Sequence, residues 1–362
     1  MNNLTKLSEN IRLERWKQTP LKEILKTNWQ PSTHQVDPIL SQISLPKDAI
    51  LITLGNGKID SRWFDDRQLP EGMIVRMLDQ TVDIQIFKDT TITRPIVLHH
   101  IAEAHDLPLN IDFTINITCE AHAKISVLMV ESGFGEYLIT PKINIDLHES
   151  AQCQWLRASL NSAESVSLST LHVNQAATSS INLLSYQSRG KIVRADIKLD
   201  LVGDGCVSEL SGLNIGKGKQ NLGHVIDINH QAPNCTSTQQ IKNLLKDQAN
   251  TLFDGKIQVF KDAQKTDAQQ ITRSILLNEK TRAITIPRLE IYANDVKCTH
   301  GATVGFLEPD HIFYLQSRGI PKNIAKQMLM QAFAMEITEQ VQNEIIKKWL
   351  TEVIVEDIKE LI

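Results

Sequence analysis

A cysteine and a histidine stand two residues apart in the segment Asp295-Val-Lys-Cys298-Thr-His300-Gly301. On a β-strand, residues two apart point to the same face, so the thiol of Cys298 and the imidazole of His300 are expected to lie side by side. A thiolate and an imidazole together suit iron, an iron–sulfur cluster or zinc. The spacing therefore marks Cys298 and His300 as candidate metal ligands.

The remaining cysteines provide the context for this pair. The five cysteines are Cys119, Cys153, Cys206, Cys235 and Cys298. Their odd number, wide gaps and lack of a Cys-x-x-Cys motif disfavour a disulfide framework or a zinc ribbon, and they fit a reducing cytosol. Counted from the preceding turns, the last four recur at one register, which is typical of a buried structural ladder. His300 has no counterpart in the other repeats, so it is the better functional candidate, whereas spacing alone favours a core position for Cys298.

Other chemistry-bearing motifs are absent from the sequence. The chain has no P-loop, so we expect it neither to bind nor to hydrolyse ATP; Gly-x-Ser-x-Gly and His-Glu-x-x-His are also missing. The glycine-rich stretch 212–218 has the wrong spacing for a nucleotide-binding motif and predicts a loop. His99, His100 and His105 can be imagined as metal ligands, but no fourth group matches them. The sequence therefore carries no signature of these enzyme classes.

Composition restricts the partners. The 362 residues include 38 Lys and Arg against 42 Asp and Glu, for a formal net charge of −4. This balance argues against nucleic acid, because phosphate binding normally requires a basic face. The start of the sequence lacks a secretory pattern, and its apolar runs are far shorter than the roughly 20 residues that span a bilayer. We therefore expect a cytoplasmic protein that binds neither nucleic acid nor membrane.

The segment around the Cys-His pair belongs to a long region of strand-like alternation. From about residue 50 to residue 304, apolar and polar residues alternate in short runs that are broken by polar turns. The breaks recur every 26 to 32 residues, a period that indicates a repeat architecture. Strand and turn units of this length fit a parallel β-helix, although a β-sandwich also gives regularly spaced strands.

Helical patterns flank this region. Leu4, Leu7 and Ile11 recur at helical spacing, and a second short helix is predicted after Pro20. After residue 308, a short helix ends at Gly319 and a longer amphipathic helix begins at Pro321. Its apolar stripe fits either a cap on the end of the solenoid or a docking surface for a partner. The predicted domains are residues 1–48 (helical region and connector), 49–307 (β-helix core) and 308–362 (C-terminal helical domain).

Three segments resemble the C-terminal part of the SufB/SufD family: Asp295 to Gly305, Phe313 to Ile320, and Ala332 to Glu336. Upstream, Phe253-Asp-Gly-Lys-Ile, residues 264–270 and Leu276-Leu277-Asn are also similar, so the resemblance covers about residues 250–340. The Cys-x-His-Gly-Ala-Thr form is most similar to the SufD branch. Thr299 stands where serine is usual, and Gln316 where arginine is usual.

The resemblance implies a fold and a function. SufD-like proteins are right-handed parallel β-helices with flanking helical domains. They are non-catalytic scaffold subunits that pair with a SufB-type paralogue and bind the ATPase SufC through C-terminal helices. The complex assembles iron–sulfur clusters in the cytosol, and a nascent cluster sits at the SufB–SufD interface. The resemblance maps a ligand of this cluster onto His300, with Cys298 beside it. Where SufB is absent, pairing of two copies of this chain is an open alternative.

Two alternatives come from other functional classes. Many polysaccharide lyases are β-helices, but they usually need aromatic sugar platforms, and aromatic residues make up only 5% of this chain. A homo-oligomeric structural solenoid without metal is the other alternative. Copurification with SufB-type and SufC-type proteins separates both from the scaffold interpretation.

Overall fold

The structure is a computed structural model, and it describes residues 14–32, 36, 43–59, 64 and 66–362. The first predicted helix, with Leu4, Leu7 and Ile11, lies outside these residues. The second is present as a short helix, α2 (Leu21–Ile24). Most of the remaining chain is β-strand.

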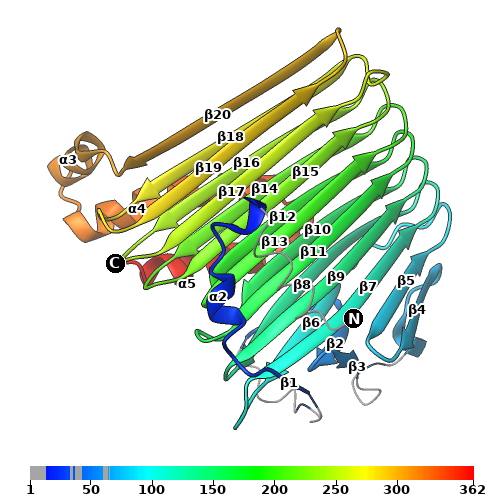
Figure 1. Cartoon of the computed structure of the whole chain (residues 1–362), viewed down its shortest axis with the longest axis horizontal. Helices are drawn as coiled ribbons and strands as arrows, with labels where there is room; N and C mark the ends of the chain where they lie inside the picture. The colour runs from blue at the N-terminus through cyan, green and yellow to red at the C-terminus, as the bar shows by residue number, and fades with distance from the viewer. Residues whose placement is uncertain (1–13, 33–35, 37–42, 60–63, 65) are drawn as a thin grey trace.

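Successive strands alternate between two sheets, so each coil of the chain adds one strand to each of the two sheets (Figure 1). Sheet A contains β4 (Met73–Leu78), β5 (Thr81–Ile86), β7 (Leu109–Cys119), β9 (Tyr137–Leu147), β11 (Val166–Gln175), β13 (Ile192–Leu201), β15 (Asn221–His230), β17 (Asn250–Val259) and β19 (Arg282–Ile291), with β1 (Gln30–Pro31) beside β7. Sheet B contains β2 (Ile50–Gly55), β3 (Lys58–Ile59), β6 (Ile96–Glu103), β8 (Lys124–Phe134), β10 (Gln152–Leu160), β12 (Ser180–Arg189), β14 (Val207–Gly216), β16 (Thr236–Leu245), β18 (Thr266–Leu276) and β20 (Val296–Phe306). Paired strands of successive coils are parallel, which confirms the predicted β-helix and excludes the sandwich.

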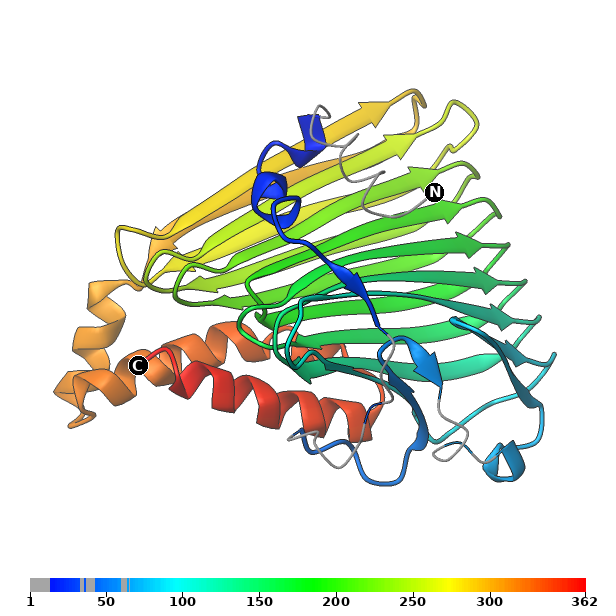
Figure 2. The same cartoon turned by 60° about the horizontal axis from the view of Figure 1, so that its bottom comes forward.

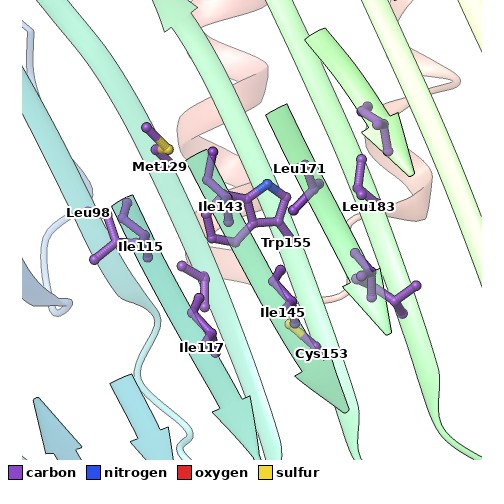
Figure 3. Packing of buried hydrophobic residues seen from close by; sticks show 14 of the residues in the cluster. Leu98, Ile115, Ile117, Met129, Ile143, Ile145, Cys153, Trp155, Leu171 and Leu183 are labelled. Carbon is purple, nitrogen blue, oxygen red and sulfur yellow. The ribbon is translucent and has the colours of Figure 1, made fainter. Parts of the chain in front are cut away.

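Regular stacking produces the core. From β7 to β20, equivalent residues of successive coils lie 26 to 32 positions apart, as the strand registers show. Apolar residues of both sheets therefore form columns that face each other across the interior, with Trp155 at their centre (Figure 3). Full burial of one such aliphatic side chain contributes about 1.5–3 kcal/mol, so the columns account for much of the stability of the fold.

The two ends of the solenoid differ. At the N-terminal end, β3 pairs antiparallel with β2, and β4 pairs antiparallel with β5. Short antiparallel pairings of this kind protect a sheet edge from other chains. At the other end, β19 pairs only with β17 and β20 only with β18 within the described residues. We call β19 and β20, with the side chains between them, the open end.

The helices α4 (Lys322–Met335) and α5 (Glu344–Lys359) cover the outer face of sheet B (Figure 2). The helices in the described part of the chain are η1 (Glu14–Trp16), α2, η4 (Asp66–Gln68), α3 (Pro309–Ser317), α4, η5 (Thr338–Gln340) and α5. The outward residues Leu156, Leu184, Leu213 and Leu244 pack against α4 and α5, and the Tyr186 hydroxyl donates to Asp357 at 2.5 Å. No described helix is long and apolar enough to cross a bilayer.

This packing corrects two expectations. The C-terminal stripe does not cap the solenoid end, because its residues Ile346, Leu350 and Ile354 are buried against the flank of sheet B. The helix predicted from Pro321 onward is also two helices, since the chain leaves α4 after Met335 and α5 starts at Glu344. The side chain of Asn343 accepts hydrogen bonds from the first backbone amides of α5 and fixes its start.

The N-terminal segment crosses the outer face of sheet A (Figure 1). Leu21, Ile24 and Trp29 bury against Val166 and Ile192. Charged contacts extend this attachment, with Arg15 bonding the Asp227 carboxylate at 2.6 Å. These hydrophobic and charged contacts of residues 14–32 are therefore with strands that precede β19.

The glycine-rich stretch is not the predicted loop. Gly212 and Gly216 belong to β14. A side chain at Gly212 would come within 2.6 Å of the Ile241 methyl group on the next coil, so glycine is needed for the close approach of two coils.

Acid should destabilise this fold through its buried histidines. Burial lowers the pKa of His100 and of His224 to about 3, and that of His99 and of His230 to about 4. Because the ordinary value of about 6.5 applies to the unfolded chain, the unfolded state binds more protons below that pH. The free energy of unfolding should therefore fall as pH falls, by up to about 1.4 kcal/mol per pH unit for each histidine.

Urea unfolding followed by circular dichroism at about pH 7 and about pH 5 measures this loss. His100→Phe is the matched variant, because the His100 ring stacks on Phe113 and neither of its nitrogens has a hydrogen-bond partner in the described structure. The variant should lose less stability between the two pH values. A wild-type unfolding free energy that does not change with pH would contradict the prediction.

Candidate metal-ligand pair at the open end

Cys298 and His300 both lie on β20 and both face the interior. In the register of sheet B, Cys298 continues the column of Ile125, Cys153 and Ile181, which are core residues. The intervening rungs are Ser208, Ser237 and Ala268. His300 continues the column of Val127, Trp155, Leu183, Leu210, Gln239 and Gln270. The thiol and the imidazole therefore share one face, as the spacing predicted.

The open end leaves this pair accessible. Cys298 is half-buried against Ala268 and Val296, and His300 is exposed. Other apolar side chains of the open end are also uncovered: Val304 is 49% exposed, Phe306 56% and Ile291 40%. An exposed apolar surface beside unpaired strand edges is typical of an interaction site.

The electrostatic surroundings keep the thiol protonated. Burial, followed by the nearby Asp267 carboxylate, raises the pKa of Cys298. A metal bound there must therefore displace a proton, because the thiolate is the ligand. In the described part of the chain, no three His, Cys, Asp or Glu side chains gather at a common point.

The other cysteines correct the expected single ladder. Cys153 and Cys298 share a column, but Cys206 and Cys235 belong to the adjacent one, because each directly precedes its strand. All are free thiols, and Cys119 is buried at the end of β7. The hydrogen bond with Cys235 lowers the pKa of Cys206 to about 7. The four buried thiols, those of Cys119, Cys153, Cys206 and Cys235, lie inside the solenoid, so they belong to the core and not to the open end.

The three histidines near residue 100 do not form a site. His99 and His100 are consecutive on β6, so they point to opposite faces of sheet B. His99 contacts the Ser132 hydroxyl at 2.9 Å, whereas His100 stacks on Phe113 inside the core. His105, in the turn that follows β6, packs on Phe134 at the end of β8.

Sequence reasoning missed two polar residues beneath His300. Gln239 and Gln270 occupy the same inward column, where the four preceding rungs are apolar. The Gln270 Nε2 donates to the Gln239 Oε1 at 3.2 Å. Polar residues in a strand are normally assigned to the solvent side. Only the coil spacing, 31 positions from Gln239 to Gln270 and 30 positions from Gln270 to His300, could have placed the two glutamines inside.

The fold and the site together define a parallel β-solenoid protein that presents a thiol and an imidazole at its single open end. The family model described as SUF system FeS cluster assembly, SufBD core domain, matches residues 111–333, from β7 into α4. The chain belongs to this family, and it is thereby a member of the iron–sulfur cluster assembly proteins of the SUF system. This membership favours cluster assembly over the polysaccharide-active alternative.

Individual relatives agree with the family assignment. The iron–sulfur cluster assembly protein SufD of Escherichia coli is 26% identical, over 92% of this chain and 86% of its own length. An iron–sulfur cluster assembly SufBD family protein of Synechocystis is 35% identical, over 54% of this chain and 44% of the relative. SufD of Bacillus subtilis is 31% identical over 44% of this chain and 37% of its own length. The resemblance to the SufB/SufD family is therefore confirmed.

Proposed function

We propose that the chain is a SufD-like, non-catalytic scaffold subunit of a cytoplasmic SufBCD-type complex. It pairs with a SufB-type paralogue through the open end, and a nascent iron–sulfur cluster is assembled between the two chains. The observation that supports this proposal is the position of Cys298 and His300, which face the interior of the last coil beside two free strand edges.

The geometry favours a cluster that is shared between chains. The His300 imidazole offers one nitrogen ligand, and Cys298 lies on the same face in a supporting role. Irons of a cluster are usually held by cysteine thiolates, and histidine replaces some of these ligands in certain clusters. A second chain at the open end can supply the remaining thiolates, so the cluster is a cargo of the pair and not of one subunit.

Anaerobic coexpression with SufB-type and SufC-type proteins tests the proposal. We expect a complex that contains this chain, the paralogue and the ATPase, and that carries iron, acid-labile sulfide and the visible absorption of a cluster. Light scattering after size exclusion gives the stoichiometry. Recovery of this chain alone or only as a homodimer, with both partners present and folded, would exclude the proposed complex.

We place the ATPase partner on α3 and the start of α4. None of the α3 residues is buried, and Phe313 and Tyr314 are 72% and 58% exposed. On α4, Ile324 and Met328 are also exposed. These four apolar residues form a candidate docking surface, whereas the stripe of α5 is already occupied by sheet B.

The double variant Phe313→Ala, Tyr314→Ala should reduce copurification of the ATPase by about tenfold or more, because exposed aromatic anchors dominate interface energies. Pairing with the SufB-type chain should be unchanged. Leu78→Ala, at an equally exposed apolar residue of β4, is the matched control. Deletion after residue 320 is a poor test, since it would expose Leu156 and its neighbours on sheet B. Undiminished ATPase binding by the double variant would refute this location.

A further inference from the structure

The inward column that ends at His300 changes from apolar to polar before it reaches the open end. Val127, Trp155, Leu183 and Leu210 form its lower rungs, and Gln239, Gln270 and His300 form the last three. Buried polar side chains are costly unless they are hydrogen-bonded. Two glutamines on consecutive rungs, directly beneath a candidate ligand, therefore require an explanation.

The Gln270 amide is fixed on one side only. Its side chain is buried, with 1% of the residue exposed, and its Nε2 donates to the Gln239 Oε1 at 3.2 Å. Across the interior, Gly255 provides the space, because a Cβ there would lie 2.1 Å from the Gln270 Nε2. The Gln270 Oε1 is buried and has no hydrogen-bond partner in the described structure.

The direction of the amide indicates what this oxygen can bind. In a column of stacked amides, each nitrogen donates to the rung below, and the oxygen is directed to the rung above. The rung above Gln270 is His300, its register partner on β20, at a strand spacing of about 4.8 Å. A buried carbonyl oxygen without a partner destabilises the fold, and a ring N–H of His300 can remove that penalty.

We propose that Gln270 is a positioning residue for His300: its Oε1 accepts a hydrogen bond from one ring nitrogen and so directs the other nitrogen toward the cluster. A neutral imidazole has one N–H donor and one free nitrogen, and the partner of the N–H decides which nitrogen can bind metal. The same hydrogen bond restricts the rotation of an otherwise exposed side chain. Histidine ligands in metal sites regularly have such a partner. The inference rests on the proposed function of His300.

Three variants in the complete complex test the inference. Gln270→Met keeps the size of the side chain but removes the acceptor, and it should lower the retained iron and sulfide by about tenfold. Gln270→Glu keeps an acceptor oxygen beneath His300. In the described wild-type structure the Gln239 Nε2 has no hydrogen-bond partner, so in this variant the Gln239 amide can turn and donate its Nε2 to the new carboxylate. This variant should restore retention. Thr272→Val, on the same strand and equally buried, is the matched control, because the Thr272 Oγ1 has no hydrogen-bond partner in the described structure, and it should stay within about twofold of the wild type.

A second readout does not depend on yield. Pulsed electron paramagnetic resonance of the reduced cluster detects the hyperfine coupling of a ligating histidine nitrogen. We expect this coupling in the wild type and in Gln270→Glu, and we expect it to be lost or altered in Gln270→Met. Thermal unfolding of each complex reports whether packing was damaged.

The outcomes separate this inference from the proposed function. If His300→Ala retains a normal cluster, the ligand assignment fails and the positioning role fails with it. If His300→Ala loses the cluster but Gln270→Met behaves like the wild type, only the positioning role is wrong. Equal losses in Gln270→Met and Thr272→Val, or no restoration by Gln270→Glu, show that the effect is one of packing and also overturn the inference.

Discussion

Replacing His300 with alanine is expected to leave the complex assembled but to lower its iron and acid-labile sulfide by about tenfold or more. His300 is exposed on the last coil, so its loss leaves no cavity in the core, and surface substitutions usually change stability by only about 0.5 kcal/mol. The cluster, in contrast, loses a nitrogen ligand. Iron–sulfur enzyme activity in cells that depend on this complex should decline in parallel.

The matched control for this variant is His148→Ala. His148 is also an exposed histidine, but it lies in the turn after β9, several coils from the open end. It should retain wild-type iron and sulfide. If the His300→Ala complex carries a normal cluster and supports normal enzyme activity, His300 is not a ligand.

Proline at Leu289 or at Ile291 is expected to weaken pairing with the SufB-type chain by about tenfold or more. The Tyr292 N–H donates to the Val259 carbonyl of β17, so even-numbered residues of β19 face β17 and odd-numbered residues face the free edge. Proline at positions 289 and 291 therefore removes donors only from the free edge. Each lost hydrogen bond is worth about 0.5–1.5 kcal/mol, and the ring also obstructs an approaching strand.

Leu289→Ala and Ile291→Ala are the matched controls, because they remove the same side chains but keep the backbone N–H groups. The native Pro287, which also faces the free edge, shows that β19 accommodates proline at an odd position. Affinity is measured by titration of the two purified chains, and unchanged circular dichroism is required of every variant. Equal affinities of the proline and alanine variants would show that the edge of β19 takes no part in pairing.

The sequence predicted the solenoid because its evidence is local and repeated. Alternation identifies strands such as Ile143–Leu147 wherever one face is buried, and the recurrence of turns fixes the coil length. The column of each cysteine was harder to predict, since it depends on the length of single turns. The turn before β14 (residues 202–206) is one residue longer than the turn before β10 (residues 148–151), and Cys206 lies within it, two positions before Ser208, which occupies the column of Cys153.

Packing partners could not be predicted from pattern alone. The stripe of α5 shows which residues are buried, but sheet B, its partner, is distant in the sequence, so the pattern left an end cap and a partner-docking surface equally plausible and did not indicate the flank of sheet B. The candidate site was found from Cys298 and His300 because their spacing on one strand is local. Gln270 was missed because its relation to His300 exists only between neighbouring coils.

The difference between the two ends limits how large an assembly can become. The hairpins at β3 and β4 terminate both sheets at the N-terminal end, whereas β19 and β20 have free edges. A subunit that has a pairing surface at only one end can bind one other subunit in this way, so assembly stops at the dimer. Adhesive surfaces at both ends would instead allow head-to-tail polymers. A pair that forms through the proposed open-end contact would therefore contain a single interface between its chains, and that interface would not repeat along a filament.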